Sequence, residues 1–191
     1  MGLLCLAVAL TGAVTLPFKR LALEGMTNFR MIGASLCATA VLLSIAQSVG
    51  VRRGDGGRSL ADMRTRDAAL VGFCQAFSAI FHGFSRSGNT ISMGLFAGLS
   101  RRAAAEYSFL LSVPTILAAA LVENVSEYRA TGHLITHGNH LSVYLAGMVT
   151  AAVVGYAAVA GLLRLVVSMK LQPFIVYTAL LGSAVLLAGL R

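Results

Sequence analysis

The chain of 191 residues is 57% hydrophobic and only 12% charged, with a mean hydropathy of +0.81. A soluble domain carries about 25% charged residues, so this composition excludes an ordinary soluble globular protein and indicates a membrane protein. The net charge of +8 is collected in short runs between apolar stretches, as in the flanks of membrane helices, which argues against nucleic-acid binding.

Apolar segments follow one another along the chain and predict an all-α fold, a polytopic helical membrane protein formed by a single transmembrane domain over residues 1–191. They cover approximately residues 3–18, 31–49, 68–82, 88–100, 103–122, 142–163 and 172–190. In the first of them the basic residues Lys19 and Arg20 follow the apolar run instead of preceding it. This order favours a short membrane helix over a signal peptide.

Two polar connectors separate these segments. Residues 51–67 hold five arginines, three aspartates and three glycines, and we interpret them as a solvated connector at the lipid headgroups. Residues 123–141 contain His133 and His137, whose spacing of four occurs in helical metal sites, but Gly138 argues against a helix there. The sequence therefore identifies no metal site.

The segments 68–82 and 88–100 are too short to span a bilayer, and they predict a re-entrant helical hairpin around residues 68–100. If this hairpin returns to its starting side, the connector 51–67, Arg101–Arg102 and residues 164–171 share one side of the membrane. That side carries nine Lys and Arg residues and the opposite side five. The positive-inside rule then places the connector 51–67 in the cytoplasm.

The polar turn of this hairpin reads HGFSRSGNTI over residues 82–91. Placing Arg86 inside a membrane costs about 2.5–3.5 kcal/mol, which makes it a candidate functional residue. A guanidinium, nearby hydroxyls, and the N–H groups and dipole of a following helix together describe a cradle for phosphate. The hydroxyls are those of Ser85, Ser87 and Thr90, and Gly83 and Gly88 allow a ligand to approach the backbone. The alternative is an arginine that is satisfied by backbone carbonyls at a helix break.

The turn, with GFCQAF before it and SRRAAAEYSFLLSVP after it, resembles the signature of the bacterial undecaprenyl-diphosphate phosphatase family, also known for bacitracin resistance. That signature is a PGxSRSGxT turn between a glutamine-containing helix and an AAEFSFLL-like helix. The likeness runs from Val71 to Pro114, and Pro173, Phe174 and Tyr177 match a further P-F-x-x-Y stretch.

The resemblance implies a multi-pass hydrolase of the bacterial plasma (inner) membrane. Such enzymes remove one phosphate from a C55 polyprenyl diphosphate, their lipid substrate, and so regenerate the monophosphate carrier for peptidoglycan synthesis. It also implies an all-helical fold with inverted repeats and two re-entrant hairpins. In this chain the implied catalytic residues are Ser85, as nucleophile or phosphate ligand, and Arg86, which neutralises the phosphates. Ser87, Gly88 and Thr90 would complete the phosphate-binding set, and Gln75 and Glu106 match the flanking helices.

The chain departs from the family pattern at two places. His82 stands where the family has proline, as an aid to proton transfer or as an incidental substitution. The glutamate-rich motif and Ser-Ser-Gly-His turn of the family's N-terminal repeat have no counterpart here. Those glutamates are the expected ligands of a divalent cation, Mg²⁺ or Ca²⁺, so the cofactor is expected while its ligands are not identified in this chain.

Three explanations of the second departure stay open. The chain is part of a longer phosphatase, or a half-length relative that binds its lipid but hydrolyses it poorly, or a chain completed by a separately encoded N-terminal half. A non-enzymatic protein that binds or transports polyprenyl phosphates is the alternative function, because re-entrant hairpins also occur in transporters. Binding without turnover would distinguish it from the phosphatase.

Overall fold

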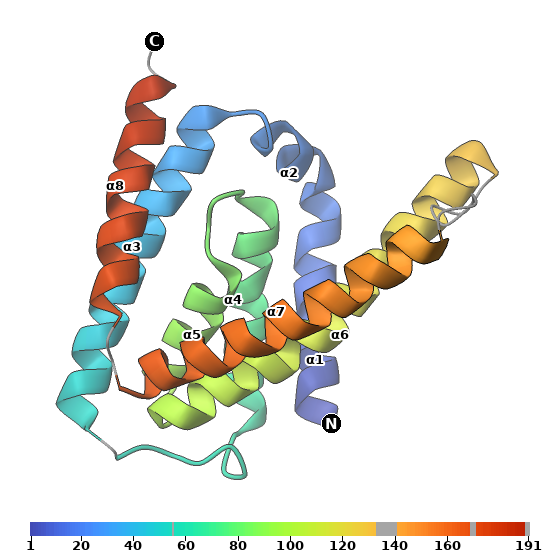
Figure 1. Cartoon of the computed structure of the whole chain (residues 1–191). Helices are drawn as coiled ribbons and strands as arrows, with labels where there is room; N and C mark the ends of the chain where they lie inside the picture. Colours follow the sequence, from blue (N-terminus) through green and yellow to red (C-terminus); the bar gives the residue numbers. More distant parts are fainter. Residues whose placement is uncertain (55, 133–140, 169–170, 190–191) are drawn as a thin grey trace.

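The computed structural model describes residues 1–54, 56–132, 141–168 and 171–189 (Figure 1). Apart from a bridge between Arg58 and Leu99, these residues form helices and their connections, which confirms the predicted all-α fold. In chain order the helices are α1 (Gly2–Thr15), the 3₁₀ turn η1 (Leu16–Phe18), α2 (Lys19–Gly25), α3 (Phe29–Arg53), α4 (Thr65–Ile80), α5 (Arg86–Phe96), α6 (Arg101–Thr131), α7 (Leu141–Val167) and α8 (Gln172–Ala188).

Within the described residues, four stretches are long and apolar enough to cross a bilayer. They are Gly2–Gly25, Phe29–Arg53, Arg101–Ala130 and Ser142–Val167. The first joins α1, η1 and α2 and is longer than the predicted segment 3–18. Because four stretches can cross the bilayer, the chain is a multi-pass membrane protein.

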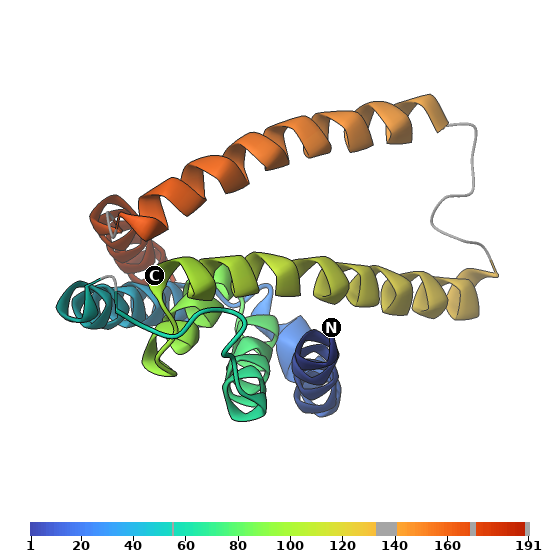
Figure 2. The same cartoon turned by 90° about the horizontal axis from the view of Figure 1, so that it is seen from below.

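Figure 2 shows α7 lying outside α6, on the side away from α1 and α4.

Helices α4 and α5 form the predicted re-entrant hairpin. At about 1.5 Å per residue they are roughly 24 and 16 Å long, too short for a hydrocarbon core of about 30 Å. Figure 1 shows the hairpin standing between α1 and α3, with its turn short of their upper ends and both of its open ends at the bottom. The turn thus lies between two spanning stretches, and irregular backbone at membrane depth needs such cover by protein.

Arg101 joins three segments at one end of the molecule. Its Nη2 donates to the carbonyl of Gly50 at 3.0 Å, and its Nη1 donates to the carbonyl of Val167 at 3.4 Å. The end of α3, the start of α6 and the end of α7 therefore lie on the same side, as a hairpin that returns to its starting side predicts. The assignment of that side to the cytoplasm stays a prediction.

Helix α4 packs against α1 at backbone distance. A Cβ atom on Gly72 would lie 2.6 Å from both Cα and O of Ala7, so only glycine allows this approach. The Thr11 hydroxyl crosses the same contact and donates to the carbonyl of Gly72 at 2.9 Å. Small residues and a buried hydroxyl bond are a usual way for helices to associate in lipid.

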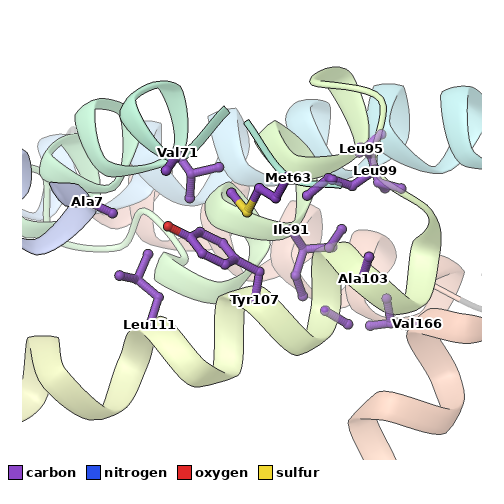
Figure 3. Close-up of a cluster of buried hydrophobic side chains, with 14 of the residues drawn as sticks. Ala7, Met63, Val71, Ile91, Leu95, Leu99, Ala103, Tyr107, Leu111 and Val166 are labelled. Carbon is purple, nitrogen blue, oxygen red and sulfur yellow. The ribbon is translucent and has the colours of Figure 1, made fainter. Parts of the chain in front are cut away.

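The main apolar core lies where α1, α4, α5 and α6 meet (Figure 3). Tyr107 of α6 is 3% exposed, and its ring lies among Val71, Ile91 and Leu111. Its hydroxyl donates to the carbonyl of Leu3 at 3.0 Å, so the core holds no unsatisfied phenol here. This packing holds α5 against α4 and α6 and so sets the position of its first turn.

Candidate active site

The turn between α4 and α5 is pressed against α3. Gly83 has φ +96°, a backbone conformation that residues with a Cβ rarely adopt. A Cβ atom at this position would lie 2.6 Å from the carbonyl oxygen of Ile32. Glycine is therefore required here by conformation and by space together.

Ser85 is the N-cap of α5. Its Oγ accepts the N–H of Gly88 at 3.2 Å, and its own backbone N–H donates to Oγ1 of Thr39 at 3.1 Å. The Thr39 hydroxyl is fully buried and in turn donates to the carbonyl of Ser35. This chain of bonds from α3 fixes the backbone at the start of α5.

Arg86 is the first residue of α5, and its side chain is exposed. Its guanidinium has no hydrogen-bond or ion-pair partner among the described residues. The alternative, an arginine satisfied by backbone carbonyls at a helix break, is therefore not what these residues show. The N–H groups in the first turn of a helix lack acceptors within that helix. Ser85 occupies the N–H of Gly88, while those of Arg86 and Ser87 have no acceptor in the described part of the chain. A cation and two free donors therefore meet at one helix end.

The structure brings Ser85, Arg86, Ser87 and Gly88 together at this helix end but gives Thr90 another neighbour. Thr90 is 2% exposed, and its hydroxyl lies 2.6 Å from Oγ of Ser108 on α6. It also donates to the carbonyl of Arg86 at 3.0 Å. Its observed bonds hold α5 against α6, and its contact with phosphate stays a prediction.

Two other predicted site residues also face α6 or belong to it. Gln75 is 2% exposed, and its Nε2 donates to Oγ1 of Thr115 at 3.1 Å. Glu106 pairs through Oε1 with Nε of Arg102 at 2.7 Å, one turn away on the same helix. The observed contacts of both residues are with α6 and not with the turn.

His82 lies in the turn and packs against the end of α2. Its Nδ1 is buried without a hydrogen-bond partner among the described residues, and a Cβ on Gly25 would lie 3.7 Å from it. Its role in proton transfer stays a prediction.

Asn89 is a residue of this region that the sequence analysis missed. It is 2% exposed, and its Nδ2 donates to the carbonyl of Cys74 and to Oγ of Ser78 on α4. The signal that could have identified it is an amide side chain within an otherwise apolar hairpin, because such a group needs hydrogen-bond partners. Asn89 ties the first turn of α5 to α4 as Thr39 ties it to α3.

Arginines hold the opposite end of the hairpin. Arg53 donates to the carbonyl of Leu95, and Arg58 donates to the carbonyl of Ala97 at 2.6 Å, so both cap the C-terminus of α5. Arg58 also pairs with the buried carboxylate of Asp67 at 2.6 Å. The connector 51–67 is therefore more firmly attached than the solvated connector that the sequence predicts.

Asp67 is held ionised by its neighbours. The hydrogen bond from Arg58 lowers the pKa of this carboxyl, burial opposes that effect, and the N–H of Arg64 lowers it further. The bond from Arg64 measures 2.9 Å and caps the start of α4.

The family model described as bacitracin resistance protein BacA matches residues 1–184. The chain belongs to the BacA family. It is 36% identical over 173 residues to the undecaprenyl-diphosphatase of Chlorobium limicola, covering 89% of this chain and 60% of that relative. Undecaprenyl-diphosphatases from Lactobacillus delbrueckii subsp. bulgaricus (34% over 177 residues, 93% and 63%) and Geobacter sulfurreducens (41% over 159 residues, 82% and 55%) are similar to it as well.

This BacA-family chain spans about 55–63% of the length of these relatives. Membership confirms the resemblance seen in the turn and its flanks. It leaves the roles of the individual residues as predictions, because the comparison concerns whole chains.

The divalent cation that the BacA family implies requires several acidic or imidazole ligands. Within the described residues, no three His, Cys, Asp or Glu side chains gather closely enough to hold a metal ion. Glu106 is already paired with Arg102, and His133 and His137 lie outside the described residues. The described residues do not fit the cation, which stays a prediction without identified ligands on this chain.

Proposed function

We propose that this protein binds the diphosphate of a polyprenyl lipid at the turn Ser85–Gly88 and acts in its hydrolysis as an undecaprenyl-diphosphatase. The observation that carries the proposal is the unpaired guanidinium of Arg86 at the first turn of α5, inside a re-entrant hairpin. A cation at a helix N-terminus is a site for an anion, and hydrocarbon around it favours an anion that carries an apolar tail. The choice of a polyprenyl diphosphate as this anion comes from the relatives, which are named undecaprenyl-diphosphatases.

In the proposed reaction, water forms a new bond to the terminal phosphorus while the bond between that phosphorus and the bridging oxygen breaks. Inorganic phosphate and the lipid monophosphate leave. Arg86 and the N–H groups of the first turn bind the non-bridging oxygens and neutralise the charge that the transferred phosphoryl group spreads over them. This stabilisation requires donors that are already in place, which the bonds of Thr39 and Asn89 provide.

The geometry favours Ser85 as a phosphate ligand. Its Oγ already accepts the N–H of Gly88, and the hydroxyl proton is left to donate to a phosphate oxygen. Acting as a donor needs no base, whereas acting as a nucleophile would require one to remove this proton. The proposed location is the bacterial plasma membrane, with the connector 51–67 on the cytoplasmic side.

The test measures phosphate release and binding of farnesyl diphosphate by the purified chain in detergent micelles. We expect Arg86→Ala to weaken binding by about 10- to 150-fold, since a hydrogen bond to a charged group contributes about 1.5–3 kcal/mol. Arg129→Ala, an exposed arginine near the far end of α6, is the control and should bind as the wild type does. Equal binding by Arg86→Ala and wild type would refute the site. Binding without phosphate release would favour the non-enzymatic alternative.

A further inference from the structure

An apolar groove runs beside the turn, between α3, α4 and α5. Its cavity volume is about 470 Å³, within the range of small-molecule sites. The side chains that decide its character are Met31, Ala38 and Leu42 from α3, Phe77 from α4, Phe81 directly after that helix, and Phe84 from the turn. Asn89 also lines it, but its amide is occupied by Cys74 and Ser78 of α4.

The groove adjoins the proposed diphosphate site directly. Phe84 and Asn89 in its wall enclose the segment Ser85–Gly88 in the sequence. Ser35, which also lines it, accepts the hydroxyl of Thr39 that holds the backbone of Ser85. The groove and the proposed diphosphate site therefore share the start of α5, so a lipid bound there can place its first carbons in the groove.

Aromatic rings form one wall. Phe77 is 40% exposed, and its ring lies parallel to that of Phe81 with centroids 6.3 Å apart and an interplanar angle of 11°. Phe73 packs edge-on against Phe77 at 5.6 Å. On the opposite wall Ala38 is exposed and small, which leaves room in front of these rings.

We infer that this groove binds the isoprene units next to the diphosphate, with Phe77, Phe81 and Phe84 as specificity-determining residues. The inference rests on the proposed function. Isoprene units contain flat double bonds and methyl branches, which pack against aromatic faces and lose less conformational freedom on binding than a saturated chain does. The groove holds only the first units, and because Ala34, Ala38 and Phe77 in its walls are exposed, it opens outward and the remaining chain continues into the bilayer.

Two substitutions change the groove from opposite directions. Ala38→Phe fills it, and Phe77→Ala removes an exposed aromatic wall with little effect on the core. Ala119→Phe, at an exposed alanine of α6, is the matched control for the first. Thermal unfolding verifies that each variant folds.

The experiment compares the affinities for farnesyl diphosphate, dodecyl diphosphate and methyl diphosphate. Wild type should bind the farnesyl compound most tightly. Ala38→Phe and Phe77→Ala should each weaken it by about tenfold, the loss expected when a few apolar carbons lose their burial. Binding of methyl diphosphate should be unchanged in both variants and in Ala119→Phe, whereas Arg86→Ala should weaken all three ligands.

The outcomes separate this inference from the proposed function. If wild type binds all three diphosphates equally, or if both groove variants keep wild-type affinity for the farnesyl compound, the tail site is overturned while the diphosphate site stands. If wild type binds none of them, the proposed function fails and the tail site fails with it.

Discussion

Replacing Gly83 by alanine tests how closely the turn is held against α3. The left-handed region costs a residue with a Cβ about 1–2 kcal/mol. The new methyl group would also lie 2.6 Å from the carbonyl oxygen of Ile32, and such overpacking costs about 1–3 kcal/mol. We therefore expect Gly83→Ala to lower the free energy of unfolding by about 2–5 kcal/mol. Denaturant titration in mixed micelles, followed by circular dichroism, measures this loss.

Gly132 provides the matched control. It also has a positive φ, +75°, but no atom of the described residues lies within 4 Å of a Cβ built there. Gly132→Ala should therefore lose only the conformational part, about 1–2 kcal/mol. Gly83→Ala should in addition weaken diphosphate binding, because Ser85 lies two residues further along. Equal losses of stability in the two variants would refute the close contact between the turn and α3.

Two further substitutions test the bonds that position the hairpin. Thr39→Val should cost about 1–3 kcal/mol by leaving the half-buried N–H of Ser85 without an acceptor, whereas Thr39→Ser should retain stability in the same titration. Equal stability of the two variants would contradict this bond. The pKa of Asp67 is lowered in the folded state, so its stabilisation is present above the unfolded pKa of about 4 and is lost as the pH falls through the lower folded value. The free energy of unfolding measured between about pH 6 and 3 should show this loss, and in Asp67→Asn it should depend less on pH. If Asp67→Asn keeps the pH dependence of the wild type, the Asp67–Arg58 pair is not the source of that dependence.

The hairpin could be predicted from the sequence because two apolar segments are too short to span and a polar turn separates them. Both properties are local, and so is the N-cap role of Ser85, which depends on residues within one helical turn. The burial of Thr90 and Gln75 could not be predicted in this way. Their types indicate hydrogen bonding, but whether the partner is a ligand or another helix depends on how α6 packs, and polar groups in lipid also bond between helices.

Residues that position the site were missed for a related reason. Thr39 is 46 residues before its partner Ser85, and Arg58 reaches Ala97 across 39 residues. Only the tertiary arrangement brings these groups together. The glycines of the connector 51–67 indicate flexibility by composition, yet Arg58 and Asp67 attach it to the base of the hairpin.

The polar side chains of the hairpin have consequences for the order in which the protein enters the membrane. Ser85 depends on Thr39 of α3, while Gln75 depends on the Thr115 hydroxyl of α6, a helix made later than the hairpin itself. An unsatisfied polar group in hydrocarbon costs several kcal/mol, so we expect the buried amide of Gln75 to disfavour insertion of α4 until α6 has left the ribosome. The segment that carries Arg86 should therefore enter the bilayer together with the helix that follows it.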